Sequence, residues 1–118
     1  MRFFLAIAVF ILIAVLHAIP SQDFPEFSFT EIFQVDKLIH AFLFAIGFFT
    51  AAIALPMQYQ VKLLRYTVIV YILYGAFLEI AQQLFFENRH ADVLDWLADI
   101  IGVFIGLFLF RKLKYLFK

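Results

Sequence analysis

One largely apolar stretch, residues 78–106, contains several side chains that could carry acid–base, ionic or hydrogen-bonding chemistry, and six of them lie in or beside apolar sequence. An acid or base at the centre of a membrane helix costs about 2.5–3.5 kcal/mol on insertion scales. The chain is 66% hydrophobic and 15% charged, so we expect these groups to face one another, a water-filled pocket or a ligand. They are Glu79, Gln82, Arg89, Asp92, Asp95 and Asp99.

A second polar group, Asp36, Lys37 and His40, opens another apolar run. Asp36 and His40 are four residues apart, which places them on the same face of a helix. Asp36 alone is explained as an N-terminal helix cap, and a single histidine in a membrane helix as an interhelical hydrogen-bonding group. Together they also fit a site that moves protons or binds a ligand, and both interpretations stay open.

Glu79 and Gln82 are three residues apart and therefore share a helix face. Gly75 lies on the same face and allows another helix to approach closely. A carboxyl group at the depth of Glu79 must be paired, solvated in a cavity or protonated. This face is therefore expected either to form a functional site or to hold helices together.

A further stripe on one helix face consists of residues three or four positions apart: Asp92, Asp95, Asp99, Gly102 and Gly106. Its last two members form G-x-x-x-G, a close-packing motif of membrane helices, so the stripe should face protein and hold the fourth helix against the third. The first two acids are also explained as partners of the helix dipole, whereas the third is too deep for that role.

Arg89 is well suited to hold an anion, because its planar guanidinium can donate two parallel hydrogen bonds to a carboxylate or phosphate. The chain has no cysteine, and no known nucleophile motif, phosphate-binding loop or HExxH motif occurs. An acidic cluster with a histidine could bind a divalent cation through oxygen ligands, but no spacing here is diagnostic. Catalytic residues, metal and cofactor are therefore left unassigned.

Four apolar segments can position these residues: 3–19, 38–55, 66–86 and 93–110. The last three approach the roughly 20 residues that cross a bilayer. The first, between Arg2 and Pro20, could be a signal peptide, but no A-x-A site follows it and we expect a retained helix. Ser28-x-x-Glu31 has capping-box spacing and predicts a short amphipathic helix on the outer bilayer surface, with a solvated loop as the alternative. Residues 57–65 are expected to form a turn.

The basic residues are distributed asymmetrically between the two sides of such a bundle. With four spans, seven of the nine Lys and Arg residues fall on one side, and all nine acids fall on the other side or in the membrane half nearest it. Cytoplasmic loops collect Lys and Arg, so both termini are expected in the cytoplasm. The seven are Arg2, Lys62, Arg65, Arg111, Lys112, Lys114 and Lys118.

Cysteine labelling of intact cells tests this orientation. The chain has no cysteine of its own, so a single cysteine at Asn88 should react with an impermeant thiol reagent added from outside. A cysteine at Gln60 should react only after permeabilisation, because it lies among the basic residues of the predicted cytoplasmic side. Labelling at Gln60 in intact cells would reverse the predicted orientation.

At these residues the chain resembles the VanZ-like family of small bacterial membrane proteins. The resemblance extends from about residue 30 to residue 110, and Asp99 departs from the pattern, which usually has asparagine there. It implies a protein of the cell envelope, and the family takes its name from a member linked to resistance to the glycopeptide antibiotic teicoplanin. The matching motifs are D-K-x-x-H, E-x-x-Q, R-x-x-D-x-x-D and G-x-x-x-G, which begin at Asp36, Glu79, Arg89 and Gly102.

These observations predict one all-α domain over residues 1–118, a polytopic bundle of four transmembrane helices with a short interfacial helix at its outer face. The expected function is recognition of an envelope amphiphile, either a lipid-linked precursor or a glycopeptide-type antibiotic, in an outward-facing pocket of the bacterial cytoplasmic membrane. An intramembrane hydrolase or transferase acting on a lipid-linked substrate, and a structural or regulatory subunit, stay open as alternatives. The lipid bilayer is the expected partner, nothing indicates nucleic-acid binding, and the oligomeric state is unassigned. The predicted pocket comprises Asp36, Lys37, His40, Glu79, Gln82, Arg89, Asp92, Asp95 and Asp99, and the predicted packing residues are Gly75, Gly102 and Gly106.

Overall fold

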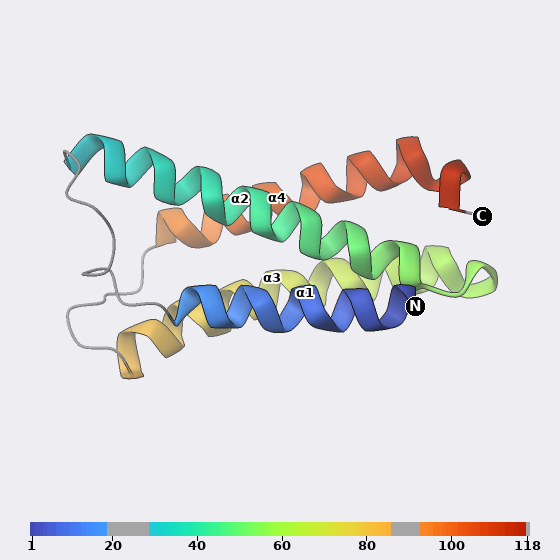
Figure 1. The fold of residues 1–118 in the computed structure, drawn as a ribbon, viewed down its shortest axis with the longest axis horizontal. Coiled ribbons are helices and arrows are strands. Elements are labelled where there is room, and N and C mark those ends of the chain that lie inside the picture. The colour runs from blue at the N-terminus through green and yellow to red at the C-terminus, as the bar shows by residue number, and fades with distance from the viewer. Residues whose placement is uncertain (19–28, 86–92, 118) are drawn as a thin grey trace.

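Helices account for nearly all of the residues that the computed structural model describes, which are 1–18, 29–85 and 93–117 (Figure 1). No strand occurs in these ranges, so the prediction of an all-α chain is confirmed. The bundle measures 46 Å along its longest axis, close to the roughly 40–45 Å of a bilayer with its head groups. In chain order the elements are α1 (Arg2–His17), α2 (Phe29–Ala54), η2 (Met57–Tyr59), α3 (Gln60–Phe85), α4 (Val93–Leu113) and η3 (Lys114–Phe117), where η denotes a 3-10 helix.

Three of the helical segments are long and apolar enough to cross a membrane: Lys37–Ala54, Met57–Phe85 and Val93–Phe117. They agree with the second, third and fourth predicted spans. Helix α1 is apolar but has only 16 residues, fewer than the roughly 20 of a typical span. Its status as a fourth span therefore stays a prediction, although it packs into the same bundle through Ile13, which is fully buried.

The connections differ from those predicted in two places. The expected interfacial helix is not separate, because residues 29–37 form the first turns of a continuous α2. No proline or glycine interrupts that stretch, so nothing in its sequence ends the helix. The expected turn at 57–65 is also shorter, since α3 already begins at Gln60. Residues 60–65 are mostly good helix formers, and they extend α3 as soon as the chain has turned after Pro56.

The apolar core runs along the axis of the bundle and contains large side chains from every helix. Exposed apolar residues cover the outside, as expected for a surface that meets lipid tails. Phe10 of α1 stacks on Tyr74 of α3 with ring centroids 3.9 Å apart. The buried core cluster comprises Ile13, Phe44, Phe48, Ala52, Tyr71, Leu78, Val103 and Phe110.

Aromatic donors tie neighbouring helices together by hydrogen bonds to backbone carbonyls. The Tyr74 hydroxyl donates to the carbonyl of Phe10 over 2.6 Å and joins α3 to α1. The Tyr71 hydroxyl donates to Gly47 over 3.1 Å and joins α3 to α2. Trp96 Nε1 donates to Ile72 over 3.0 Å and joins α4 to α3. Tyr71 is buried and the other two rings are partly buried, and a phenol or indole removed from water needs such a partner. These bonds therefore fix how the helices are rotated against one another.

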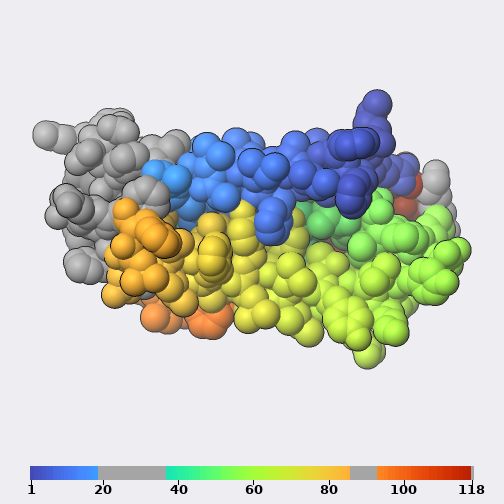
Figure 2. All heavy atoms as spheres, turned by 90° about the horizontal axis from the view of Figure 1, so that it is seen from below, coloured from blue at the N-terminus to red at the C-terminus, as the bar shows by residue number. Residues whose placement is uncertain are grey.

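The two ends of the bundle differ in chemistry. The N- and C-termini lie at one end, which we call the basic end, and Arg2 there lies 6.0 Å from the ring centre of Phe117 (Figure 1). At the other end, which we call the polar end, α1 and α3 finish and α4 begins (Figure 1). Figure 2 shows α1 lying along α3 between these ends, as Figure 1 does from another side.

Candidate functional site

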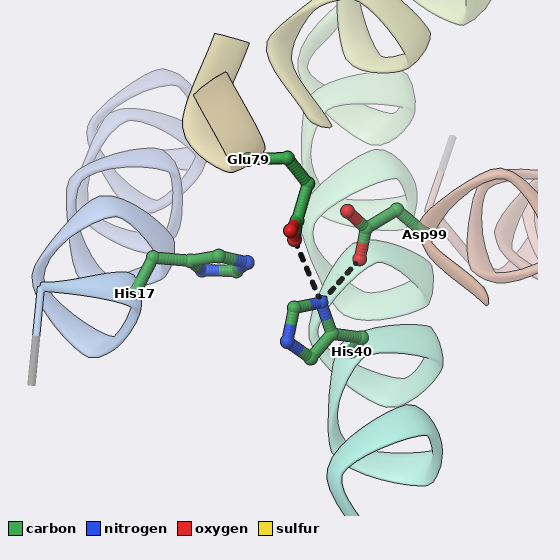
Figure 3. A group of neighbouring side chains, drawn as sticks. All are labelled: His17, His40, Glu79 and Asp99. Carbon is green, nitrogen blue, oxygen red and sulfur yellow. Dashed lines mark hydrogen bonds and ion pairs between the residues drawn. The ribbon is translucent and has the colours of Figure 1, made fainter. Parts of the chain in front are cut away.

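Four ionisable side chains meet inside the bundle near its polar end, one from each helix (Figure 3). We call them the four-residue cluster: His17 of α1, His40 of α2, Glu79 of α3 and Asp99 of α4. None is more than 6% exposed. Glu79 lies six residues before the end of α3 and Asp99 six residues after the start of α4. The two carboxylates are therefore about 9 Å inside the helix ends, at roughly 1.5 Å per residue.

His40 is the centre of the cluster. Its Nδ1 atom lies 2.9 Å from Oδ1 of Asp99 and 3.8 Å from Oε1 of Glu79. A carboxylate only accepts, so the 2.9 Å bond is an N–H of the imidazole donating to Asp99. The imidazole therefore lies between two carboxylates from two other helices (Figure 3).

His17 completes the cluster and is not among the residues predicted from the sequence to form the pocket. Its Nδ1 donates to the carbonyl oxygen of Ile13 over 2.8 Å, one turn earlier in α1. A carbonyl cannot donate, so the proton is on Nδ1 and the Nε2 atom of a neutral ring carries the lone pair. The ring meets that of His40 edge to face, with centroids 4.6 Å apart. Figure 3 shows the ring extending from α1 toward Glu79 and His40.

Asp99 is fully buried, and a glycine on α3 makes room for it. A Cβ atom added at Gly75 would lie 3.0 Å from Oδ2 of Asp99 and 3.2 Å from Trp96. The predicted role of Gly75, to admit another helix, therefore corresponds to the contact between α3 and α4. Within the part of the chain that the structure describes, Oδ2 of Asp99 is buried and accepts no hydrogen bond.

Two further contacts surround the cluster. Gln82 Nε2 donates to the backbone carbonyl of His17 over 2.8 Å, which fixes the end of α1 against α3. Lys37 Nζ lies 2.9 Å from Oδ1 of Asp95 and forms a salt bridge between α2 and α4. The Lys37 side chain is 20% exposed, whereas Gln82 is buried. These residues position the helices that carry the cluster.

Gly102 and Gly106 pack against α2, so the prediction that they face the third helix is wrong. A Cβ atom at Gly102 would lie 2.3 Å from the carbonyl oxygen of Ala41, and one at Gly106 would lie 2.6 Å from that of Ala45. Helices α2 and α4 are separated along the chain by the whole of α3, yet their backbones approach closely at both glycines. The glycine motif identifies a close contact but carries no information about which helix provides the other side.

The residues of the predicted pocket fall into three groups. His40, Glu79 and Asp99 meet in the cluster, and Lys37, Gln82 and Asp95 make the contacts beside it. Asp36 lies in α2, but the structure does not describe its side chain. Arg89 and Asp92 lie outside the described residues, so their predicted roles stay predictions.

The cluster combines two kinds of group that exchange protons and bind cations. Imidazole nitrogens and carboxylate oxygens from its four members lie within 4.8 Å of one another. Such an arrangement can hold a proton between His40 and either carboxylate, or bind a positively charged group. Either use requires the helices to stay in place, which the bonds of Gln82 and Lys37 support.

The comparisons with known proteins give one match. The model of the family described as VanZ/LLP1 matches residues 3–117, which is nearly the whole chain. No curated protein and no solved structure matches the chain.

Proposed function

The chain belongs to the VanZ/LLP1 family, and we propose that this VanZ-type membrane protein recognises the head group of an envelope amphiphile at the polar end of its bundle. The observation that carries the proposal is that a buried ionisable cluster and an apolar groove suited to a lipid chain both lie at this end. Buried ionisable side chains from all four helices lie there, and an apolar groove of about 720 Å³ begins next to Lys37.

The groove follows α2 and α4 from the polar end toward the basic end. Every residue that lines it is apolar, and its volume is within the roughly 300–1,000 Å³ of small-molecule sites. An acyl or isoprenoid chain lying in it would place a head group near Lys37, the residue before the first lining residue, Leu38. The lining residues are Leu38, Ile39, Ala41, Phe42, Ala45, Ile46, Phe49, Ile105, Leu109 and Leu113.

An anionic head group fits the charges near this end. Lys37 is partly exposed and paired with Asp95. Its ammonium group has three N–H donors, so in the proposed complex one of them would be directed to an anion of the head group. Arg89, between α3 and α4 in the sequence, would supply the bidentate contact to a phosphate or carboxylate that lysine cannot make. His40 and Glu79 would then make polar contacts or move protons beneath the head group.

The charge asymmetry supports an orientation in which the polar end faces outward from the cytoplasmic membrane. Arg2, Lys62 and the cations of the C-terminal segment belong to the opposite, basic end, and cytoplasmic segments favour such residues. A site at the outward end would meet lipid-linked precursors of the envelope and antibiotics that arrive from outside.

A binding measurement with a long-chain phosphate tests this function. The purified protein in detergent would be titrated with undecaprenyl phosphate, and binding would be followed by native mass spectrometry. Ile105→Trp fills the groove and should weaken binding at least about tenfold, the result of losing roughly 1.4 kcal/mol of contact. Arg89→Gln should weaken it as well, because the predicted phosphate contact is lost.

Phe104→Trp is the matched control. Phe104 is the neighbouring residue on α4, is 52% exposed and does not line the groove, so the same bulky side chain there should leave binding unchanged. The same titration with teicoplanin, which carries an acyl chain, and with vancomycin, which does not, would then show whether the protein binds an acylated antibiotic or only the lipid-linked phosphate. Equal affinities for undecaprenyl phosphate in all three variants and the wild type would refute the proposed function.

The cluster also supports a second candidate, an intramembrane hydrolase or transferase acting on a lipid-linked substrate. Two imidazoles beside two carboxylates provide both a proton acceptor and a proton donor, which acid–base catalysis requires. In hydrolysis of a polyisoprenyl pyrophosphate, the oxygen of a water molecule would bond to the terminal phosphorus while the bond from that phosphorus to the bridging oxygen breaks. A base of the cluster would take the water proton and an acid would protonate the leaving polyisoprenyl phosphate, so inorganic phosphate is released. Release of phosphate from undecaprenyl pyrophosphate in the same preparation would favour this candidate over simple binding.

A further inference from the structure

The donor atoms of the four-residue cluster converge from four directions on a small volume. His17, His40, Glu79 and Asp99 each direct one nitrogen or oxygen toward it, and these atoms lie within 4.8 Å of one another. Each comes from a different helix (Figure 3). Metal sites in helix bundles are commonly built this way, from inward side chains on facing helices.

The charges of the cluster match a divalent cation. If both carboxylates are ionised, Glu79 and Asp99 together carry two negative charges at buried positions. Among the described residues, Lys37 is already in contact with Asp95, and a protonated His40 would supply only one positive charge. Buried charges in proteins are paired or coordinate metals, because an uncompensated charge in an apolar interior is very costly.

His17 has the second contact that metal-binding histidines usually have. Such a histidine donates the N–H of one ring nitrogen to a carbonyl or carboxylate, which fixes the tautomer and directs the other nitrogen to the metal. The Nδ1 of His17 donates to the carbonyl of Ile13 over 2.8 Å. The other nitrogen, Nε2, is buried and lies at the edge of the ring that faces Glu79 and His40 in Figure 3.

Asp99 provides an independent indication of a ligand. Its side chain is fully buried, one oxygen accepts from His40, and within the described residues the other oxygen accepts no hydrogen bond. Figure 3 shows both oxygens on the side of the cluster. A buried carboxylate oxygen without a donor has lost its hydrogen bonds to water and gained nothing in exchange, and a bound cation would supply the missing favourable interaction.

From these observations we infer that the four-residue cluster is a binding site for a divalent transition-metal cation, with Zn²⁺ as the best fit. Two imidazole nitrogens and two carboxylate oxygens are a donor set that zinc accepts in four-coordinate sites. With bonds of about 2.0–2.2 Å, ligand atoms of a tetrahedral site are roughly 3.3 Å apart, so rotation of the side chains would bring the present arrangement to that size. The cation would join all four helices at the polar end, whatever amphiphile the protein binds.

Metal content of the purified protein tests the inference directly. Metal would be removed from the protein in detergent with a chelator, and the protein would then be incubated with Zn²⁺ and dialysed. The bound metal would be measured by inductively coupled plasma mass spectrometry. We expect about one Zn²⁺ per chain and a higher melting temperature with Zn²⁺ than with chelator, because a ligand that binds only the folded state stabilises it. Co²⁺ should bind in its place and give the visible absorption of a four-coordinate site.

Conservative variants identify the ligands. His17→Gln, Glu79→Gln and Asp99→Asn each replace an imidazole or carboxylate ligand with an amide of similar volume, and each should weaken Zn²⁺ binding by at least about tenfold. Asp95→Asn is the matched control, because it removes a negative charge one turn from Asp99 on the same helix, while the amide oxygen of the new asparagine can still accept the hydrogen bond that Lys37 makes there. It should retain the full Zn²⁺ content.

Two results would overturn the inference. One is a wild-type protein that binds neither Zn²⁺ nor Co²⁺ and melts at the same temperature with and without chelator; this result needs no variant, so it does not depend on whether a variant folds. The other is an equal loss of Zn²⁺ in Asp95→Asn and Asp99→Asn, which would indicate general attraction of cations to acidic residues. Binding of undecaprenyl phosphate is measured separately, so either proposal can fail alone.

Discussion

Replacing Gly102 with alanine is expected to destabilise the protein by about 3 kcal/mol or more, at or above the upper end of typical overpacking costs. The added Cβ atom would lie 2.3 Å from the carbonyl oxygen of Ala41 and 3.0 Å from its Cα atom. Both are backbone atoms of α2, so no change of rotamer relieves the clash and the two helices must move apart. The movement would also stretch the 2.9 Å bond between His40 on α2 and Asp99 on α4.

Thermal unfolding of the purified protein in detergent measures this effect, with Gly47→Ala as the matched control. A Cβ atom at Gly47 would lie 2.7 Å from Cδ1 of Ile13, the end of a flexible side chain that can rotate away. We therefore expect a clearly smaller loss there, and almost none for Phe104→Leu on the exposed face of α4. Similar losses at Gly102 and Gly47 would mean that the close approach of α2 and α4 is not what limits stability.

The sequence contained enough information to predict three of the four members of the cluster. His40, Glu79 and Asp99 each interrupt a long apolar helix, where an ionisable group is too costly to face lipid. This cost depends only on the depth of each residue in its own helix, and the three helices match candidate membrane spans. Which side chains would bond to which depended on how the helices rotate, and single-helix spacing does not determine that.

His17 could not be identified in this way, because it lies in the last turn of α1, where a polar residue is expected at a membrane surface. Helices α2 and α3 extend past it at the polar end (Figure 1), and its ring is buried against those of His40 and Phe44 on α2. The contact between α2 and α4 was missed for a similar reason. Chain order favours contacts between consecutive helices, whereas the glycine motif allows any partner with a small residue, here Ala41.

Replacing His40 with leucine should have the second large effect, a loss of about 3–5 kcal/mol, because it leaves the buried carboxylates of Asp99 and Glu79 without their imidazole. A second change, Asp99→Leu in the same chain, should recover a large part of that loss. The double variant replaces a buried ionic pair with apolar side chains, which is often close to neutral for stability. Two ionisable members of the four-residue cluster, Glu79 and His17, then remain.

Unfolding free energies of the wild type, both single variants and the double variant complete the thermodynamic cycle, and a chelator in the buffer removes any contribution from bound cations. The pair of Lys37 and Asp95 serves as the comparison, since its side chains are 20% and 11% exposed and water can screen the charges. Lys37→Met should therefore cost less than His40→Leu and show weaker coupling to Asp95→Leu. If the losses from His40→Leu and Asp99→Leu simply add, the two residues do not stabilise each other, and the 2.9 Å contact cannot be the interaction that keeps these charges buried.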